Sequence, residues 1–252
     1  MNRKAFFDAI RPAFGQLSQP QIDGMEALLD AGKRLPLHHM ANVLAQVRRE
    51  TGGYMSPIKE TVMPSHKDKN PSDAEVIRRL DRAFAAGKLP WVTKPYWRDG
   101  FFGRGPLQIT HQKNYAKFGI TDPNDALKLD VGARIAVKGM SEGMFTGKKL
   151  ADYDFPAALD APPDSNPRRI VNGKDGSDRE VAKFHRQFAA ALEAAGWGNS
   201  PHSELRNNPV ITPKPLTQAE IDDLQAAADA NRPKHWLTHV IAFLAWLFGG
   251  NK

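Results

Sequence analysis

The chain has 252 residues, of which 41% are hydrophobic and 25% are charged, a balance typical of a folded soluble protein rather than a disordered one. It contains no cysteine, which excludes disulfide bonds and thiolate metal sites. The formal net charge of +7 indicates an anionic partner, such as nucleic acid, an acidic membrane or bacterial cell wall.

Up to residue 197 the sequence predicts helices that glycine and proline separate. Alternating apolar and polar residues are scarce, so we expect a mainly α fold with at most a small sheet. Capping boxes, proline starts and glycine stops predict helices over residues 19–31, 36–50, 73–86 and 130–145, and a fifth helix that starts at 178 and has an apolar face as far as Leu192.

The chain changes character after Trp197. Residues 198–216 hold four prolines among polar residues and predict a linker, and residues 217–252 predict a helical tail. The run 236–248 is apolar and carries a tryptophan near each end, but it is shorter than the ~20 apolar residues that cross a bilayer. We expect it to lie at a membrane surface or, equally, to dock on the body or on a second subunit. The predicted domains are therefore 1–197, 198–216 and 217–252.

An acidic residue ends the apolar stripe of the second predicted helix. Glu50 follows Met40, Val43 and Val47 on one face, in the last turn of the helix. Burial and the negative end of the helix dipole both favour the protonated carboxyl, which suits a proton donor. The alternative is an ordinary glutamate paired with Arg48, Arg49 or a distant arginine.

A second carboxylate follows a turn that suits ligand binding. Gly52 and Gly53 permit close approach of the backbone, and Tyr54 offers a ring for stacking on a sugar. Two carboxylates on opposite sides of a glycosidic bond are the usual equipment for its hydrolysis. Glu60, Asp68 and Asp73 are the candidate partners of Glu50, and the sequence pattern does not choose among the three.

An aromatic and glycine-rich loop spans residues 101–110 and runs into amides and hydroxyls, which suit neutral sugar groups. The alternative is a structural turn with Phe101 and Phe102 in the core. No nucleotide-binding pattern surrounds the glycines, and the histidines lack metal-ligand spacing. The substrate-binding candidates of this region are Arg104, Gln108, Thr110, Asn114 and Tyr115.

From about residue 20 to 197 the chain resembles glycoside hydrolase family 19, and within it the phage and bacterial lysozyme-like branch more than plant chitinases. The resemblance rests on Glu-Thr-Gly-Gly at 50–53, Phe-Gly-Arg-Gly-Pro-Leu-Gln-Ile-Thr at 102–110 and Val-Asn-Gly at 171–173. It implies a lysozyme-like helical body with a cleft between two lobes, an inverting mechanism, Glu50 as general acid, and sugar contacts from Gln108, Thr110, Asn114 and Asn172. Arg49 departs from the histidine of many members, while Glu60 matches the shorter loop of the phage-type branch.

The resemblance implies an endolysin that hydrolyses β-1,4 bonds of peptidoglycan during host lysis, with no cofactor and no metal. The start of the chain lacks the apolar core of a signal peptide, so we expect synthesis in the bacterial host cytoplasm and action at the wall, with membrane contact through 236–248. The alternatives are a chitinase, a lytic transglycosylase or a non-catalytic wall-binding protein. A nucleic-acid partner is not expected, because no docking motif appears and the cationic residues are scattered.

Overall fold

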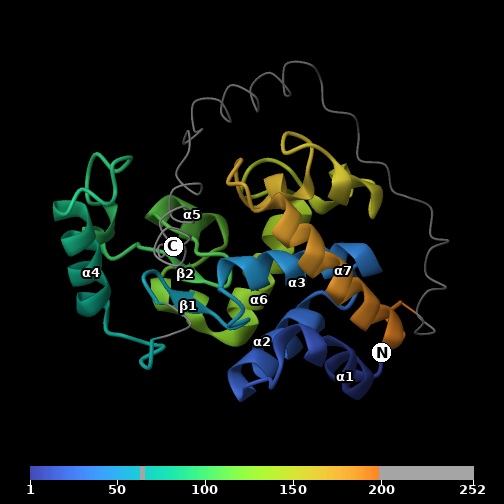
Figure 1. Cartoon of the computed structure of the whole chain (residues 1–252). Coiled ribbons are helices and arrows are strands. Elements are labelled where there is room, and N and C mark those ends of the chain that lie inside the picture. Colours follow the sequence, from blue (N-terminus) through green and yellow to red (C-terminus); the bar gives the residue numbers. More distant parts are fainter. Residues whose placement is uncertain (63–65, 199–252) are drawn as a thin grey trace, which may run out of the picture.

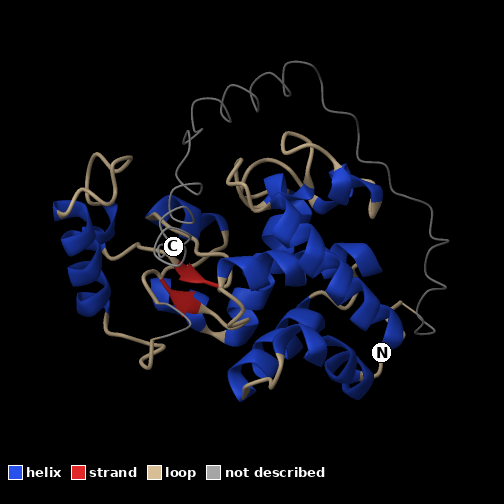
Figure 2. Cartoon of the chain, in the orientation of Figure 1, coloured by secondary structure: helices blue, strands red, loops and turns tan. Residues whose placement is uncertain are grey.

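The computed structural model describes residues 1–62 and 66–198, and Figure 1 shows their arrangement. Nearly all of the predicted linker and the whole predicted tail lie outside these residues. The described part is mainly α, as predicted, with one two-stranded sheet near its centre (Figure 2). None of its helices is both long and apolar enough to cross a membrane. The α-helices and strands are α1 Arg3–Phe14, α2 Gln19–Ala31, α3 Leu37–Glu50, β1 Ile58–Lys59, α4 Asp73–Ala85, β2 Arg104–Gly105, α5 Gln112–Lys117, α6 Leu129–Glu142 and α7 Asp178–Ala194.

Helix α3 is the centre of the main core. Every residue from Met40 to Val47 is buried, so the helix is enclosed on all sides rather than on one stripe. It packs along α7, while α1 packs on α7 and α2 packs on α6 (Figure 1). The end of α3 is therefore held from several directions, which fixes the position of Glu50.

The sequence signals located most helix starts. Ser18 and Gln21 form the predicted capping box of α2, and the Ser72 hydroxyl accepts a hydrogen bond from the N–H of Glu75 in α4. The predicted cap at Ser177 is different, because its hydroxyl donates to Asp175 Oδ1 (2.7 Å) and does not cap α7. Helix α6 ends at Glu142, three residues before the predicted end, because Gly143 adopts a left-handed conformation.

Helix α1 was not predicted. The Asn2 side chain caps it by accepting from the N–H of Ala5, and Phe6 and Ile10 join the main core. Pro12 lies inside this helix, close to its end. A proline at that position weakens a helical pattern in the sequence.

A second, smaller hydrophobic cluster surrounds α4. Val76 and Leu80 of α4 pack with Trp97, which lies in the short 3-10 helix Tyr96–Asp99, and with Phe102. In Figure 1 this unit lies to the left, away from α1, α2 and α7. The antiparallel pairing of β1 with β2 sets Ile58 opposite Gly105 and Lys59 opposite Arg104. Glu60 directly follows β1, so this pairing brings it beside the 101–110 loop.

Candidate active site

The Glu50 carboxylate is fully enclosed at the end of α3, with no exposed side-chain surface. Its nearest charged partner is Arg168, whose Nη1 lies 2.7 Å from Glu50 Oε1. The N–H of that nitrogen is aligned with Gln46 Oε1 (2.6 Å) rather than with Glu50. Within the described residues, neither oxygen of Glu50 receives an aligned hydrogen bond. The contact with Arg168 is therefore a short ion pair whose N–H groups are not well aligned with the carboxylate.

Arg168 is shared between two carboxylates. Its Nη2 donates to Asp175 Oδ2 (2.7 Å), and its Nε lies within 3.2 Å of the same atom. Ser177 donates to the other oxygen of Asp175 through its backbone N–H and its hydroxyl. Burial opposes ionisation of Asp175, but Arg168 and the Ser177 hydrogen bonds outweigh it and hold its pKa at about 2. The two carboxylates thus share the cation, and its aligned hydrogen bonds go to Asp175 and to Gln46.

The remaining interactions raise the pKa of Glu50. Burial raises its pKa, and the positive charges of Arg168 and Arg49 oppose that shift without cancelling it. The ionised Asp175 acts in the same direction as burial. A carboxyl whose pKa lies above its usual range can carry a proton to a reacting oxygen near neutral pH. The contact with Arg168 is the distant arginine partner of the sequence alternative, and the role of Glu50 as proton donor stays a prediction.

Glu60 is buried to the same degree but is held by different contacts. The Tyr96 hydroxyl donates to Glu60 Oε1 (2.7 Å), and the backbone N–H of Gly103 donates to Oε2 (2.7 Å). Burial raises the pKa of Glu60, and these two hydrogen bonds and the charge of Arg104 oppose the shift. Both oxygens are thereby fixed in direction.

The loop beside Glu60 is strained. Gln108 and His111 in the loop and Thr61 next to Glu60 all have positive φ angles, of 52°, 65° and 70°. Residues other than glycine adopt this conformation at an energetic cost, and such residues gather at functional sites. Thr61 Oγ1 and Gln108 Oε1 are also buried without a hydrogen-bond partner in the described part of the chain. Strain and unused polar atoms together mark this region as a candidate binding site.

Gly103 allows the loop to approach Glu60. A Cβ atom at this position would lie 2.9 Å from Gln108 Oε1 and 3.3 Å from Glu60 Oε2. The absence of a side chain therefore lets the backbone donate to Glu60 while the Gln108 amide packs beside it. The structure thus brings Glu60 and Gln108 together, as the sequence analysis requires of residues in one cleft.

The other candidates of the loop have internal partners. The Gln108 amide nitrogen donates to Ile58 O and Gly105 O, and the hydroxyl of Thr110 donates to Gln108 O. The Asn114 amide donates to Thr110 O and the Tyr115 hydroxyl to Phe102 O. These contacts shape the loop, and direct sugar contact by these side chains stays a prediction.

Arg104 is buried, and its guanidinium contacts other groups of the protein. Its guanidinium lies 3.7 Å from the centroid of the Phe102 ring and donates to Gly100 O and to Asp73 Oδ2, both at 2.7 Å. Only 1% of the residue is exposed. These contacts tie the loop to the start of α4, and Phe102 itself is in the core, as the structural alternative for this loop predicted for at least one ring.

The rival bases are placed less favourably than Glu60. Asp73 is half-buried and bound by Lys59 and Arg104, which outweigh burial and lower its pKa. Asp68 is exposed and accepts from the N–H of Asn70. A base that is buried and held by directed hydrogen bonds is better positioned for catalysis than one that binds two cations or faces solvent.

The two remaining candidates, Asn172 and Tyr54, lie in different surroundings. The Asn172 amide donates to Asp175 Oδ2 (3.2 Å), which places it in the same buried network as Glu50 and Arg168. Tyr54 follows the Gly52-Gly53 turn and lines a surface pocket. No group of three or more histidine, aspartate or glutamate residues within the described ranges could hold a metal ion.

Sequence reasoning did not single out Arg168, Asp175 or Tyr96. A buried arginine has no local signature, since its burial depends on carboxylates brought from elsewhere. The one available signal was the position of Asp175, three residues after the Asn172 candidate.

No protein-family model, curated protein or solved structure matches the chain.

Proposed function

We propose that this chain is a glycoside hydrolase that cleaves the β-1,4 bonds of bacterial peptidoglycan, with Glu50 as the general acid and Glu60 as the general base. The observation that carries the proposal is the pair of buried carboxyls with raised pKa values and different partners. One lies beside a cation that it shares with a second carboxylate, and the other is held at both oxygens. Such a difference in environment is how one site obtains an acid and a base from two glutamates.

In the proposed reaction, protonated Glu50 donates its proton to the glycosidic oxygen as the bond from that oxygen to the anomeric carbon breaks. Ionised Glu60 takes one proton from a water molecule, whose oxygen bonds to the anomeric carbon from the opposite face. The configuration inverts, and no covalent intermediate forms. Both carboxyls are covered in the free protein, so binding of a glycan requires the segments above them to move.

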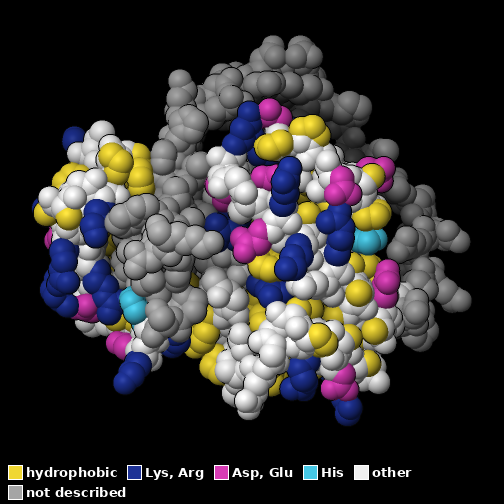
Figure 3. Space-filling model, in the orientation of Figure 1, with side chains coloured by type: hydrophobic (Ala, Val, Ile, Leu, Met, Phe, Trp, Pro, Cys, Tyr) yellow, Lys and Arg dark blue, Asp and Glu magenta, His cyan; other side chains and the backbone are white. Residues whose placement is uncertain are grey.

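The choice of polymer rests on charge. Peptidoglycan bears carboxylates, whereas chitin is neutral, and the chain carries a net charge of +7. Figure 3 shows lysine and arginine side chains on this face of the molecule, including the part that carries α4. Exposed cations there include Arg78, Arg82, Lys94 and Arg98. Cleavage of this substrate would serve host lysis. The segment 236–248, for which membrane contact is predicted, lies outside the described residues.

Mass spectrometry of digested peptidoglycan tests the proposal. The wild-type protein should release fragments with reducing ends, and Glu50→Gln should release at least ~100-fold less, because glutamine keeps the shape and lacks the transferable proton. Anhydro ends would instead identify a lytic transglycosylase. Cleavage of chitin oligomers in preference to peptidoglycan would identify a chitinase, and binding without cleavage would identify a wall-binding protein.

A further inference from the structure

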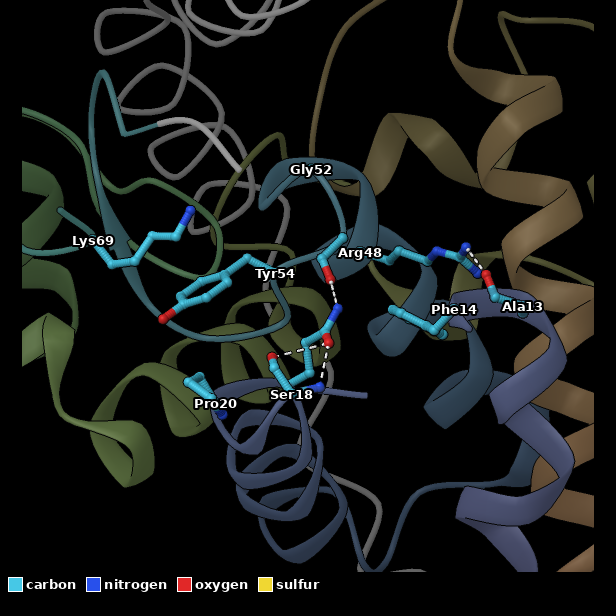
Figure 4. Close-up of a pocket in the computed structure, with 10 residues that line it drawn as sticks. Ala13, Phe14, Ser18, Pro20, Arg48, Gly52, Tyr54 and Lys69 are labelled. Carbon is cyan, nitrogen blue, oxygen red and sulfur yellow. Dashed lines mark hydrogen bonds between the residues drawn. The ribbon is translucent and has the colours of Figure 1, made fainter. Parts of the chain in front are cut away.

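A surface pocket lies where the end of α1, the start of α2 and the 52–54 turn meet (Figure 4). Its volume is about 570 Å³, within the range of small-ligand sites. The Gln21 amide crosses one side of it, donating to Gly53 O (2.9 Å) and accepting from the N–H of Ser18. The lining residues are Ala13, Phe14, Ser18, Pro20, Gln21, Arg48, Gly52, Gly53, Tyr54 and Lys69.

The pocket is electropositive. Two of its lining residues are cationic, Arg48 and Lys69, and none of the ten is acidic. The Arg48 guanidinium lies between the rings of Phe14 and Phe184, at 4.1 and 4.0 Å from their centroids. Its hydrogen bonds go to neutral acceptors, Ala13 O and the Gln187 amide. These contacts fix the charge in place. Within the described residues Arg48 forms no direct ion pair, although the carboxylate of Glu180, which pairs with Arg49, also attracts its charge.

The pocket also has an apolar side. The Lys69 ammonium lies 5.4 Å from the centroid of the Tyr54 ring, and Figure 4 shows it above that ring with Pro20 nearby. A ligand that suits these walls combines a negative charge with aliphatic surface. A neutral N-acetylated sugar fits less well, because it has no negative charge to pair with Arg48 or Lys69.

The pocket lies on the other side of the turn from Glu50. Arg48 and Glu50 are two residues apart on α3, a rotation of roughly 200°, so they project in nearly opposite directions. Gly52 and Gly53 form the turn that separates the two sites. A chain bound near Glu50 would have to pass over this turn to enter the pocket.

We propose that this pocket binds the acidic peptide stem that hangs from peptidoglycan, an inference that rests on the proposed function. The stem supplies the required chemistry, since it carries carboxylates and short aliphatic side chains. An extended peptide spans about 3.3–3.6 Å per residue, so a few residues reach across the turn. Tyr54 then packs against the stem instead of a sugar ring, and the pocket distinguishes peptidoglycan from chitin.

Binding of the free stem peptide, released from peptidoglycan by an amidase, tests this inference without any need for hydrolysis. Titration followed by calorimetry should show binding to the wild-type protein. Lys69→Glu should weaken it at least about threefold, on the scale of exposed charge pairs. Lys67→Glu is the matched control, because Lys67 is exposed and does not line the pocket, and it should bind as the wild type does.

No binding to the wild type, or equal weakening by both variants, would overturn the stem pocket. Hydrolysis of peptidoglycan by the same wild-type preparation is measured in parallel. If glycan is cleaved and the peptide does not bind, only this inference fails. If the peptide binds in the expected pattern and no glycan is cleaved, the proposed hydrolase activity fails and the pocket stands.

Discussion

Glu50 and Glu60 are equally buried, yet the protein compensates their charges in different ways. Glu50 ends a helix of the main core and lies beside a cation, Arg168, that it shares with Asp175. Glu60 follows a short strand and accepts two directed hydrogen bonds, from Tyr96 and Gly103.

This difference shows how two equally buried carboxyls can suit two different roles, those of an acid and of a base. Burial raises the pKa of Glu50 although the shared cation opposes that shift, and a raised pKa is what the proposed proton donor requires. Directed hydrogen bonds stabilise the ionised form and fix its orientation, which a base requires. The following predictions separate the two environments, from the largest expected effect to the smallest.

Replacement of the shared cation should have the largest effect. Arg168→Met leaves Glu50 and Asp175 buried without their common partner, and removal of one member of a buried ion network costs about 3–5 kcal/mol. Denaturant unfolding measures this loss. Arg186→Met is the control, because its pair with Asp160 is exposed and should contribute less than about 1 kcal/mol. Equal losses in the two variants would show that the Arg168 network does not support the fold.

Filling the space at Gly103 should disturb Glu60 and its neighbour Gln108. In Gly103→Ala the new methyl group meets the Gln108 amide and the Glu60 carboxylate, and such overpacking costs about 1–3 kcal/mol. We expect hydrolysis to fall because the hydrogen bond to Glu60 lengthens. Unchanged stability and activity would mean that the loop yields freely, contrary to the close packing described here.

Loss of one hydrogen bond should have a smaller effect. Tyr96→Phe removes the hydroxyl that stabilises ionised Glu60, at a cost of about 1 kcal/mol in unfolding free energy. The pKa of Glu60 should rise further, so the acid limb of the pH–rate profile should move to higher pH. An unmoved acid limb would argue against Glu60 as the base.

The Glu50 side of the molecule should also respond to acid through His185. This residue of α7 is buried, with its ring stacked on His38 and Phe155, and burial lowers its pKa to about 3. The unfolded chain takes up the proton near pH 6.5, so the stability from the neutral ring is present above that pH. It is lost at about 1.4 kcal/mol per pH unit as pH falls from 6.5 towards 3.

Unfolding at pH 7.5 and at pH 5.5 checks this expectation. His185→Gln should lose less stability than the wild type over that interval, and hydrolysis at neutral pH should change little. The same pH dependence in both proteins would assign the acid sensitivity to other groups.

The sequence predicted those features that depend on neighbouring residues in the chain, such as the ends of helices and their buried faces. Capping boxes and glycine stops located α2 and α4, and the apolar stripe of α3 predicted the burial of Glu50. It could not predict the Glu50 contact with Arg168, because that contact depends on how α3 packs against a segment far along the chain. The positive φ angle of Gln108 has no signal either, since residues other than glycine enter that conformation only when the surrounding structure imposes it.

Azide rescue tests most directly whether Glu50 is the general acid and Glu60 the general base, as proposed. In Glu60→Ala the acid remains, so azide should replace the activated water and restore cleavage of soluble glycan fragments. Because azide attacks opposite to the β-linked leaving group, magnetic resonance should identify an α-glycosyl azide. Glu50→Ala, which lacks the acid, should not be rescued. Rescue of Glu50→Ala, or a β-glycosyl azide from Glu60→Ala, would contradict the assignment.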